Sequence, residues 1–206
     1  MLLKIHPQNP QSRLIEKALD TYRAGGVVVV PTDTTYGLTC DLYSKSATQR
    51  LYQLRKLSPK KLLSVLCVDL RQVSEYAIIT TPAYRKIRRA LPGPYTFILQ
   101  ATGAIPNYFQ GNRKQVGIRI PDNVICQALL EKLGHPILIA SLLPEDEVSP
   151  VSIDPAQLHE REKNVVDCVI DVGVLPLEQS TVVDFTQSPP QIVRKGKGKI
   201  DLFETE

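Results

Sequence analysis

Basic side chains are the residues of this chain whose types and spacing suggest chemistry. Groups of Lys and Arg that converge on one cleft or face would hold a phosphorylated ligand, either a nucleotide or an RNA. The net charge of +4 permits such a partner without requiring one. Four groups occur, namely Arg50, Arg55, Lys56, Lys60 and Lys61; Arg85, Lys86, Arg88 and Arg89; Arg113, Lys114 and Arg119; and Arg194, Lys195, Lys197 and Lys199.

Arg119 and Arg194 differ from the other basic residues in their sequence context. Each ends a short apolar stretch and is followed by Pro or Gly within two residues. A charge at a strand end points out of the sheet, where ligands of α/β proteins usually lie. The residues from Arg85 to Arg89 are expected instead to form the solvated face of a helix. Ser180-Thr181 places hydroxyls before another strand, where a simple turn and a ligand contact are equally good interpretations.

Several common types of nucleotide-binding and catalytic site are excluded because the sequence lacks their motifs. Gly196-Lys197-Gly198-Lys199 lacks the longer loop and the final Ser or Thr of a nucleotide-binding P-loop. The chain also has no Gly-x-Ser-x-Gly, no His-Glu-x-x-His and no dinucleotide fingerprint. No metal site held by the protein is predicted, since the cysteines form no Cys-x-x-Cys pair and lie far from the histidines. We expect buried free thiols at Cys40, Cys67, Cys126 and Cys168.

The elements that must position these residues follow from hydrophobic periodicity. It predicts helices over residues 14–22, 46–55, 70–76, 82–91, 124–133 and 155–163. It predicts strands over residues 27–30, 62–68, 95–100, 117–120, 137–140, 165–172, 181–185 and 191–194. Helices interleaved with short strands indicate an α/β protein with a mixed sheet and helices packed against it.

The strand Val27–Val30 has a distinctive setting. Four consecutive β-branched residues are typical of a strand buried on both faces. Thr32–Gly37 follows and is predicted to be a loop, too rich in hydroxyls to belong to the core. Loops at strand ends are where sites are usually built.

Length and composition bound the class of protein. With 206 residues, 43% hydrophobic and 22% charged, residues 1–206 are expected to form a single domain. The first residues lack the pattern of a secretory signal, and no apolar run reaches the roughly 18 residues of a membrane span. A cytoplasmic location in a reducing compartment is therefore predicted.

Five motifs, taken in order, resemble those of the YrdC/YciO family. The resemblance covers nearly the whole chain and implies a YrdC/RibB-like fold, an open twisted mixed sheet with helices around a large basic concave cavity. The family includes threonylcarbamoyl-AMP synthases, which combine L-threonine, bicarbonate and ATP for the threonylcarbamoyladenosine modification of tRNA. The motifs are Pro31-Thr32-Asp33-Thr34-Thr35-Tyr36-Gly37-Leu38, Leu91-Pro92-Gly93-Pro94-Tyr95-Thr96, Gly117-Ile118-Arg119-Ile120-Pro121, Ser180-Thr181-Val182-Val183-Asp184 and Ile192-Val193-Arg194-Lys195-Gly196.

The resemblance also implies roles for individual residues. By motif match, catalysis is expected from Arg55 and Arg119, and nucleotide binding from Lys61 and Arg194. ATP would enter as its Mg²⁺ complex, with L-threonine and bicarbonate as the other substrates. Residues expected to bind the amino-acid substrate are Thr34, Tyr36, Ser141 and Ser180.

Two departures from the synthase motifs matter. The synthases carry Lys-x-Arg after the second helix, whereas this chain has Arg55-Lys56-Leu57. They carry Ser-x-Asn where this chain has Ser141-Leu142-Leu143. Losing one stabiliser of developing charge typically costs on the order of a hundredfold in rate. Both changes are similar to the YciO-like branch. Arg55 could replace the family's lysine, or it and Lys56 could simply end a helix next to its dipole.

The sequence therefore leaves two alternative functions open. The first is a threonylcarbamoyl-AMP synthase-like nucleotidyltransferase with weak or altered activity, such as hydrolysis of the adenylate. The second is a non-catalytic protein that binds double-stranded RNA, such as tRNA or ribosomal RNA, through shape and phosphate contacts. Steep salt dependence of RNA affinity would distinguish the second.

Overall fold

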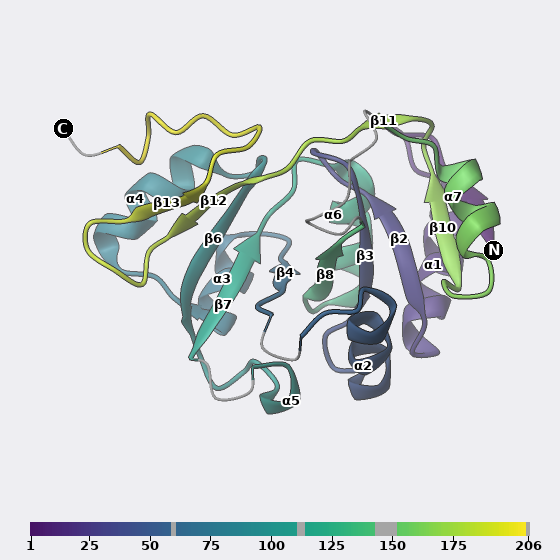
Figure 1. Ribbon diagram of the computed structural model, residues 1–206, viewed down its shortest axis with the longest axis horizontal. Helices are drawn as coiled ribbons and strands as arrows, with labels where there is room; N and C mark the ends of the chain where they lie inside the picture. Colours follow the sequence, from purple (N-terminus) through teal and green to yellow (C-terminus); the bar gives the residue numbers. More distant parts are fainter. Residues whose placement is uncertain (59–60, 111–113, 143–151, 205–206) are drawn as a thin grey trace.

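The fold is built on one long mixed sheet, whose strands lie side by side across the width of Figure 1. The computed structural model describes residues 1–58, 61–110, 114–142 and 152–204. The sheet runs in the order β1-β10-β2-β3-β8-β4-β7-β6-β12-β13, with β5 paired to β6. Its strands are β1 (Leu2–Lys4), β2 (Val27–Pro31), β3 (Tyr36–Asp41), β4 (Ser64–Leu66), β5 (Ala77–Ile78), β6 (Tyr95–Ala101), β7 (Gln115–Arg119), β8 (Ile137–Ser141), β10 (Cys168–Asp171), β12 (Thr181–Asp184) and β13 (Gln191–Arg194).

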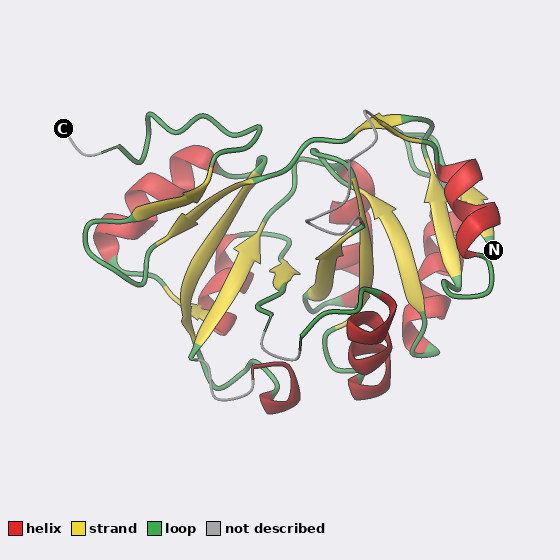
Figure 2. Ribbon diagram, in the orientation of Figure 1, coloured by secondary structure: helices red, strands yellow, loops and turns green. Residues whose placement is uncertain are grey.

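Helices cover the sheet and a small ribbon adds to it (Figure 2). The ribbon pairs β9 (Ser152–Ile153) with β11 (Leu175–Pro176) in antiparallel fashion. Parallel and antiparallel pairs alternate irregularly, since β4 runs parallel to β7 but antiparallel to β8. The helices are α1 (Ser12–Arg23), α2 (Lys45–Leu54), α3 (Leu70–Tyr76), α4 (Thr81–Ala90), α5 (Asn107–Gln110), α6 (Val124–Leu133) and α7 (Pro155–Glu162).

Two hydrophobic clusters lie on opposite faces of β2. Val28 and Val30 point into a cluster with helices α1 and α6. Val27 and Val29 point into the larger cluster, which contains Leu51 of α2. Because successive strand residues face opposite sides, this alternation confirms that the Val27–Val30 strand is buried on both faces.

The structure largely confirms the predicted helices and strands, although some strands are shorter than predicted. Asp154 caps α7 by accepting hydrogen bonds from Ala156 and Gln157 N–H, and Pro155 opens the helix. Strands predicted over 62–68 and 165–172 are shorter, reduced to β4 and β10. The basic side chains of Arg85, Arg88 and Arg89 are exposed on α4, as expected of a solvated helix face.

The prediction that Thr32–Gly37 is a loop outside the core is wrong in two respects. Tyr36 and Gly37 begin strand β3, which pairs antiparallel with β2. Thr32 and Thr34 are 5% and 3% exposed. Their burial is possible because their hydroxyls hydrogen-bond to one another at 3.0 Å and to other groups of the same turn.

The four cysteines are buried free thiols, as predicted. In the described part of the chain, every helix is too short or too polar to cross a membrane.

Candidate functional site

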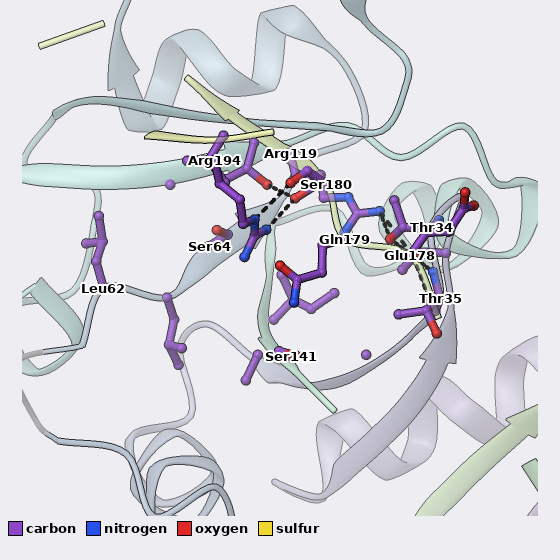
Figure 3. Close-up of a pocket in the computed structure, with 18 of the residues that line it drawn as sticks. Thr34, Thr35, Leu62, Ser64, Arg119, Ser141, Glu178, Gln179, Ser180 and Arg194 are labelled. Atoms are coloured by element: carbon purple, nitrogen blue, oxygen red, sulfur yellow. Dashed lines mark hydrogen bonds between the residues drawn. The ribbon is translucent and has the colours of Figure 1, made fainter. Parts of the chain in front are cut away.

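A cavity of about 630 Å³ opens on the sheet. Figure 3 shows Leu62 and Ser64 at one end and Thr34 and Thr35 at the other. Its walls come from the β2–β3 turn, from the ends of β6, β7 and β8, from the segment before β12, and from β13. Seven of the eight predicted site residues line it, namely Thr34, Tyr36, Lys61, Arg119, Ser141, Ser180 and Arg194.

Arg119 is held at one end of the cavity by the β2–β3 turn. Its Nη2 donates to Thr34 Oγ1 at 2.7 Å and to Thr32 Oγ1 at 3.1 Å, and it forms an ion pair with Asp33. The residue is 7% exposed. Its Nε is buried and has no hydrogen-bond partner among the described residues. The guanidinium is thus held in one orientation in the wall of the cavity, where its positive charge would attract an anionic ligand.

Asp33 orients Arg119 and is itself held by the backbone. Its Oδ2 accepts a hydrogen bond from Asp122 N–H at 3.1 Å, while Oδ1 faces Arg119. Both side chains of the ion pair are more than nine-tenths buried. Local sequence patterns assign no role to Asp33 beyond its place in the first motif, because its partner lies 86 residues away.

Ser180 and Arg194 form a second polar group in the cavity. Ser180 Oγ hydrogen-bonds Thr96 Oγ1 at 2.8 Å, and Arg194 Nη2 donates to Ser180 Oγ at 3.2 Å. Arg194 Nε also donates to the Ser180 carbonyl at 3.1 Å. The contacts hold the arginine side chain along the wall formed by β12 and β13 (Figure 3).

The glycine-rich segment after β13 supports this wall rather than binding phosphate as a P-loop would. Gly196 passes so close that an added Cβ would lie 2.3 Å from the Gln179 carbonyl oxygen. Lys197 N–H donates to that carbonyl at 2.9 Å, and Gly196 N–H donates to Thr181 Oγ1 at 3.0 Å. The segment therefore fixes the backbone of Ser180 from behind.

Tyr36 lines the cavity, but its hydroxyl joins β3 to the loop after β10. It donates to the Gly173 carbonyl at 2.7 Å and accepts from Val172 N–H at 3.1 Å. Burial raises the pKa of this phenol well above its usual range, so the hydroxyl stays protonated. Its present contacts are structural.

Ser141 and Lys61 complete the predicted set within the cavity. Ser141 ends β8 opposite Gly37 of β3 and is exposed. The Lys61 backbone is fixed by Ser58 O, which accepts from Lys61 N–H at 2.8 Å, and by Tyr52 OH, which donates to Lys61 O at 2.8 Å.

Arg55 is the predicted catalytic residue that the structure does not bring to the cavity lining. It forms the C-terminal cap of α2, and Lys56 follows with a left-handed φ of 47°. Leu57 is partly buried against the main hydrophobic cluster. Leu143 lies outside the described residues, as do Lys60 and Arg113.

At the Arg119 end, Lys197 of the fourth basic group meets Glu178, a residue that the sequence did not single out. Lys197 Nζ lies 2.7 Å from Glu178 Oε2 and donates to the Asp33 carbonyl at 2.9 Å. Glu178 lines the cavity. No sequence signal links these residues, because Lys197 and Asp33 are 164 residues apart. Among the described residues, no group of three or more His, Cys, Asp or Glu side chains could hold a metal ion.

This geometry defines an α/β protein with a concave candidate site. The volume lies within the roughly 300–1,000 Å³ of ligand pockets, and polar and charged side chains line it together with apolar ones. The Sua5/YciO/YrdC family model, described as "Telomere recombination", matches residues 20–196. The chain belongs to this family.

Relatives place the chain within the family. It is 41% identical over 201 residues to the uncharacterised protein YciO of Escherichia coli K12, covering 97% of both chains. The crystal structure of E. coli YciO matches with a TM-score of 0.92 and 40% identity over 99% of both chains. Sua5 of Pyrococcus abyssi, crystallised with L-threonine, matches with a TM-score of 0.86 and 26% identity, covering 95% of this chain and 57% of that one.

Relatives identified as threonylcarbamoyl-AMP synthases are more distant. The putative synthase of Methanocaldococcus jannaschii is 28% identical over 200 residues, covering 95% of this chain and 92% of its own. The higher identity to YciO confirms the resemblance to the YciO-like branch. The mixed-sheet fold predicted from the motifs is confirmed by the matching structures.

Proposed function

We propose that the cavity binds L-threonine and an adenine nucleotide, and that the protein is a threonylcarbamoyl-AMP synthase-like nucleotidyltransferase acting in tRNA modification. The observation that carries this proposal is the buried Arg119 guanidinium, which lines the cavity and is oriented by Asp33 and Thr34. A guanidinium fixed in this way suits a carboxylate. The family relationship to Sua5, which was crystallised with L-threonine, supports the same choice of ligand.

In this proposal the Arg119 end of the cavity holds the amino acid. The threonine carboxylate contacts Arg119, and the hydroxyls of Thr34 and Ser141 lie within the same lining. Because Arg119 is already oriented, binding costs little side-chain entropy. The threonine ammonium group and bicarbonate would form a carbamate with release of water and a proton.

The nucleotide end uses Lys61 and Arg194. A carbamate oxygen attacks the α-phosphorus of ATP, and the bond from that phosphorus to the bridging oxygen breaks to release pyrophosphate. Lys61 and Arg194 would neutralise the charge on the phosphates, together with the Mg²⁺ that enters with ATP. The catalytic role of Arg55 stays a prediction, since its side chain lies outside the described lining.

The geometry favours a small ligand over a duplex RNA backbone. Arg119 is paired with Asp33, and Lys197 with Glu178, so both of these cations already face carboxylates. Binding along a phosphate backbone draws its affinity from cations that are available to phosphates. The exposed arginines of α4 lie outside the described cavity lining.

The test is a synthase assay with ATP, Mg²⁺, bicarbonate and labelled L-threonine, following pyrophosphate and threonylcarbamoyl-AMP. The variants are Arg119→Ala and, as a matched control, Arg85→Ala on the exposed face of α4. We expect product from the wild type, a loss on the order of a hundredfold or more in Arg119→Ala, and no change in the control.

Other outcomes separate the alternatives. If the protein binds threonine and consumes preformed threonylcarbamoyl-AMP but does not synthesise it, the amino-acid site is as proposed and the reaction is a different one. Absence of threonine binding, combined with RNA affinity that falls steeply with salt, would overturn the proposal in favour of RNA binding.

A further inference from the structure

The candidate cavity contains a side-chain amide that the sequence did not single out. Among the described lining residues the one amide belongs to Gln179, in the segment between β11 and β12. The residue is exposed, and its side chain makes no hydrogen bond to another described residue. Its NH₂ group and its carbonyl oxygen are therefore available to a ligand.

Neighbouring polar side chains of the cavity are engaged with one another. Thr34 Oγ1 accepts a hydrogen bond from Arg119 Nη2, and Ser180 Oγ bonds to Thr96 Oγ1. The Gln179 amide has no such contact among the described residues. Because an exposed amide is hydrated in the free protein, a ligand oxygen that takes the place of this water keeps the hydrogen bond.

The backbone of Gln179 is fixed, although its side chain is not paired. The Gln179 carbonyl accepts a hydrogen bond from Lys197 N–H at 2.9 Å. The next residue, Ser180, is 5% exposed, and its carbonyl accepts from Arg194 Nε at 3.1 Å. The side chain therefore starts from a defined point in the cavity wall, which limits the region that its amide can reach.

Figure 3 shows where the amide points. The Gln179 side chain extends into the cavity, with Arg194 on one side and Thr34 and Thr35 on the other. Thr34 is the residue that contacts the Arg119 guanidinium. If Arg119 receives the threonine carboxylate and Arg194 the phosphates, the amide faces the middle of the ligand, where the carbamate oxygen meets the α-phosphorus.

We propose that the Gln179 amide donates a hydrogen bond to a non-bridging oxygen of the α-phosphate and stabilises the charge that develops there. The inference rests on the proposed function, since it assumes that both substrates occupy this cavity. In the step concerned, a bond forms between a carbamate oxygen and the α-phosphorus, the bond from that phosphorus to the bridging oxygen breaks, and pyrophosphate leaves. Oriented amide donors of this kind stabilise developing negative charge, whereas a carboxylate in the same place would repel both anionic reactants.

The experiment measures steady-state formation of threonylcarbamoyl-AMP by the full-length protein, with threonine and ATP varied in turn. Gln179→Ala removes the amide, and Gln179→Glu keeps its size but replaces the NH₂ donor by a carboxylate oxygen. Gln157→Ala is the matched control, because Gln157 is also exposed and without a side-chain partner among the described residues, but lies on α7 outside the described lining.

We expect kcat to fall about ten- to hundredfold in Gln179→Ala, because one donor to the transition state is lost. It should fall further in Gln179→Glu, because the carboxylate adds repulsion. The KM for threonine should stay unchanged in Gln179→Ala, since the contacts of Arg119 are not altered. The control should match the wild type in both constants.

The other outcomes overturn the inference in different ways. Wild-type kcat in Gln179→Ala or in Gln179→Glu would mean that the amide does not contact the reacting phosphate, and the proposed function would be unaffected. A raised KM for threonine with unchanged kcat in Gln179→Ala would mean that the side chain supports the amino-acid site instead. If the wild type forms no threonylcarbamoyl-AMP, the proposed function fails and this inference fails with it.

Discussion

Replacing Asp33 by Asn should reveal how strongly the β2–β3 turn holds Arg119. The two carboxylate oxygens of Asp33 both face donors, since Oδ1 meets Arg119 Nη2 and Oδ2 meets Asp122 N–H. An Asn side chain has one acceptor oxygen and one NH₂ donor. In either orientation of the amide, the NH₂ group must therefore point at another donor.

The expected cost follows from burial. Breaking a fully buried ion pair by removing one charge costs roughly 3–5 kcal/mol. Arg119 lines an open cavity and retains Thr32 and Thr34 as acceptors, which lowers the cost. We expect Asp33→Asn to lower the free energy of unfolding by about 2–3 kcal/mol, from the lost charge and the donor–donor contact. Threonine affinity should fall as well, because Arg119 is no longer fixed.

Urea denaturation at pH 7 measures the first effect and calorimetry the second. Glu16→Gln is the control, because Glu16 pairs with Lys132 on the surface with both side chains about two-fifths exposed. Exposed pairs of this kind contribute little, so we expect no measurable change. If Asp33→Asn is as stable as the control and binds threonine normally, Asp33 does not hold Arg119 in the manner described.

The remaining predictions concern the packing of the C-terminal segment and the buried thiols. Gly198→Ala should lower the free energy of unfolding, measured in urea, by roughly 1–3 kcal/mol, because the added Cβ would lie 2.3 Å from the Tyr95 ring. Gly103→Ala is the control and should leave the free energy of unfolding unchanged, because the space around Gly103 is open. Equal stabilities of the two variants would refute the close approach at Gly198. Burial raises the pKa of Cys40 and Cys126 to about 12 and that of Cys168 to about 11. In the unfolded chain these thiols ionise near pH 9, so their contribution to the free energy of unfolding is fully present below that pH. Above it the free energy of unfolding should fall by about 1.4 kcal/mol per pH unit per thiol, up to pH 11–12. Urea titrations at pH 8 and pH 10 measure this fall, and equal stability at both pH values would contradict burial of the thiols.

The sequence by itself determined most helices and many of the sheet strands. Periodicity placed α3 and α6 at their observed bounds, and Asp154-Pro155 marked the start of α7. These signals are local, because a helix is specified by residues three and four positions apart and by its caps. The family resemblance also predicted eight site residues, and seven of these line the cavity.

Only the tertiary structure decided which strands pair and which charges meet. Strand β8 lies between β3 and β4, a neighbourhood that no local pattern encodes. Thr32 and Thr34 can be buried because Arg119, far along the chain, donates hydrogen bonds to their hydroxyls. Lys197 meets both Glu178 and the Asp33 carbonyl because the chain returns to this place after β13. Periodicity specifies the faces of an element, whereas ion pairs such as Arg119–Asp33 and Lys197–Glu178 depend on contacts between residues far apart in sequence or on different elements.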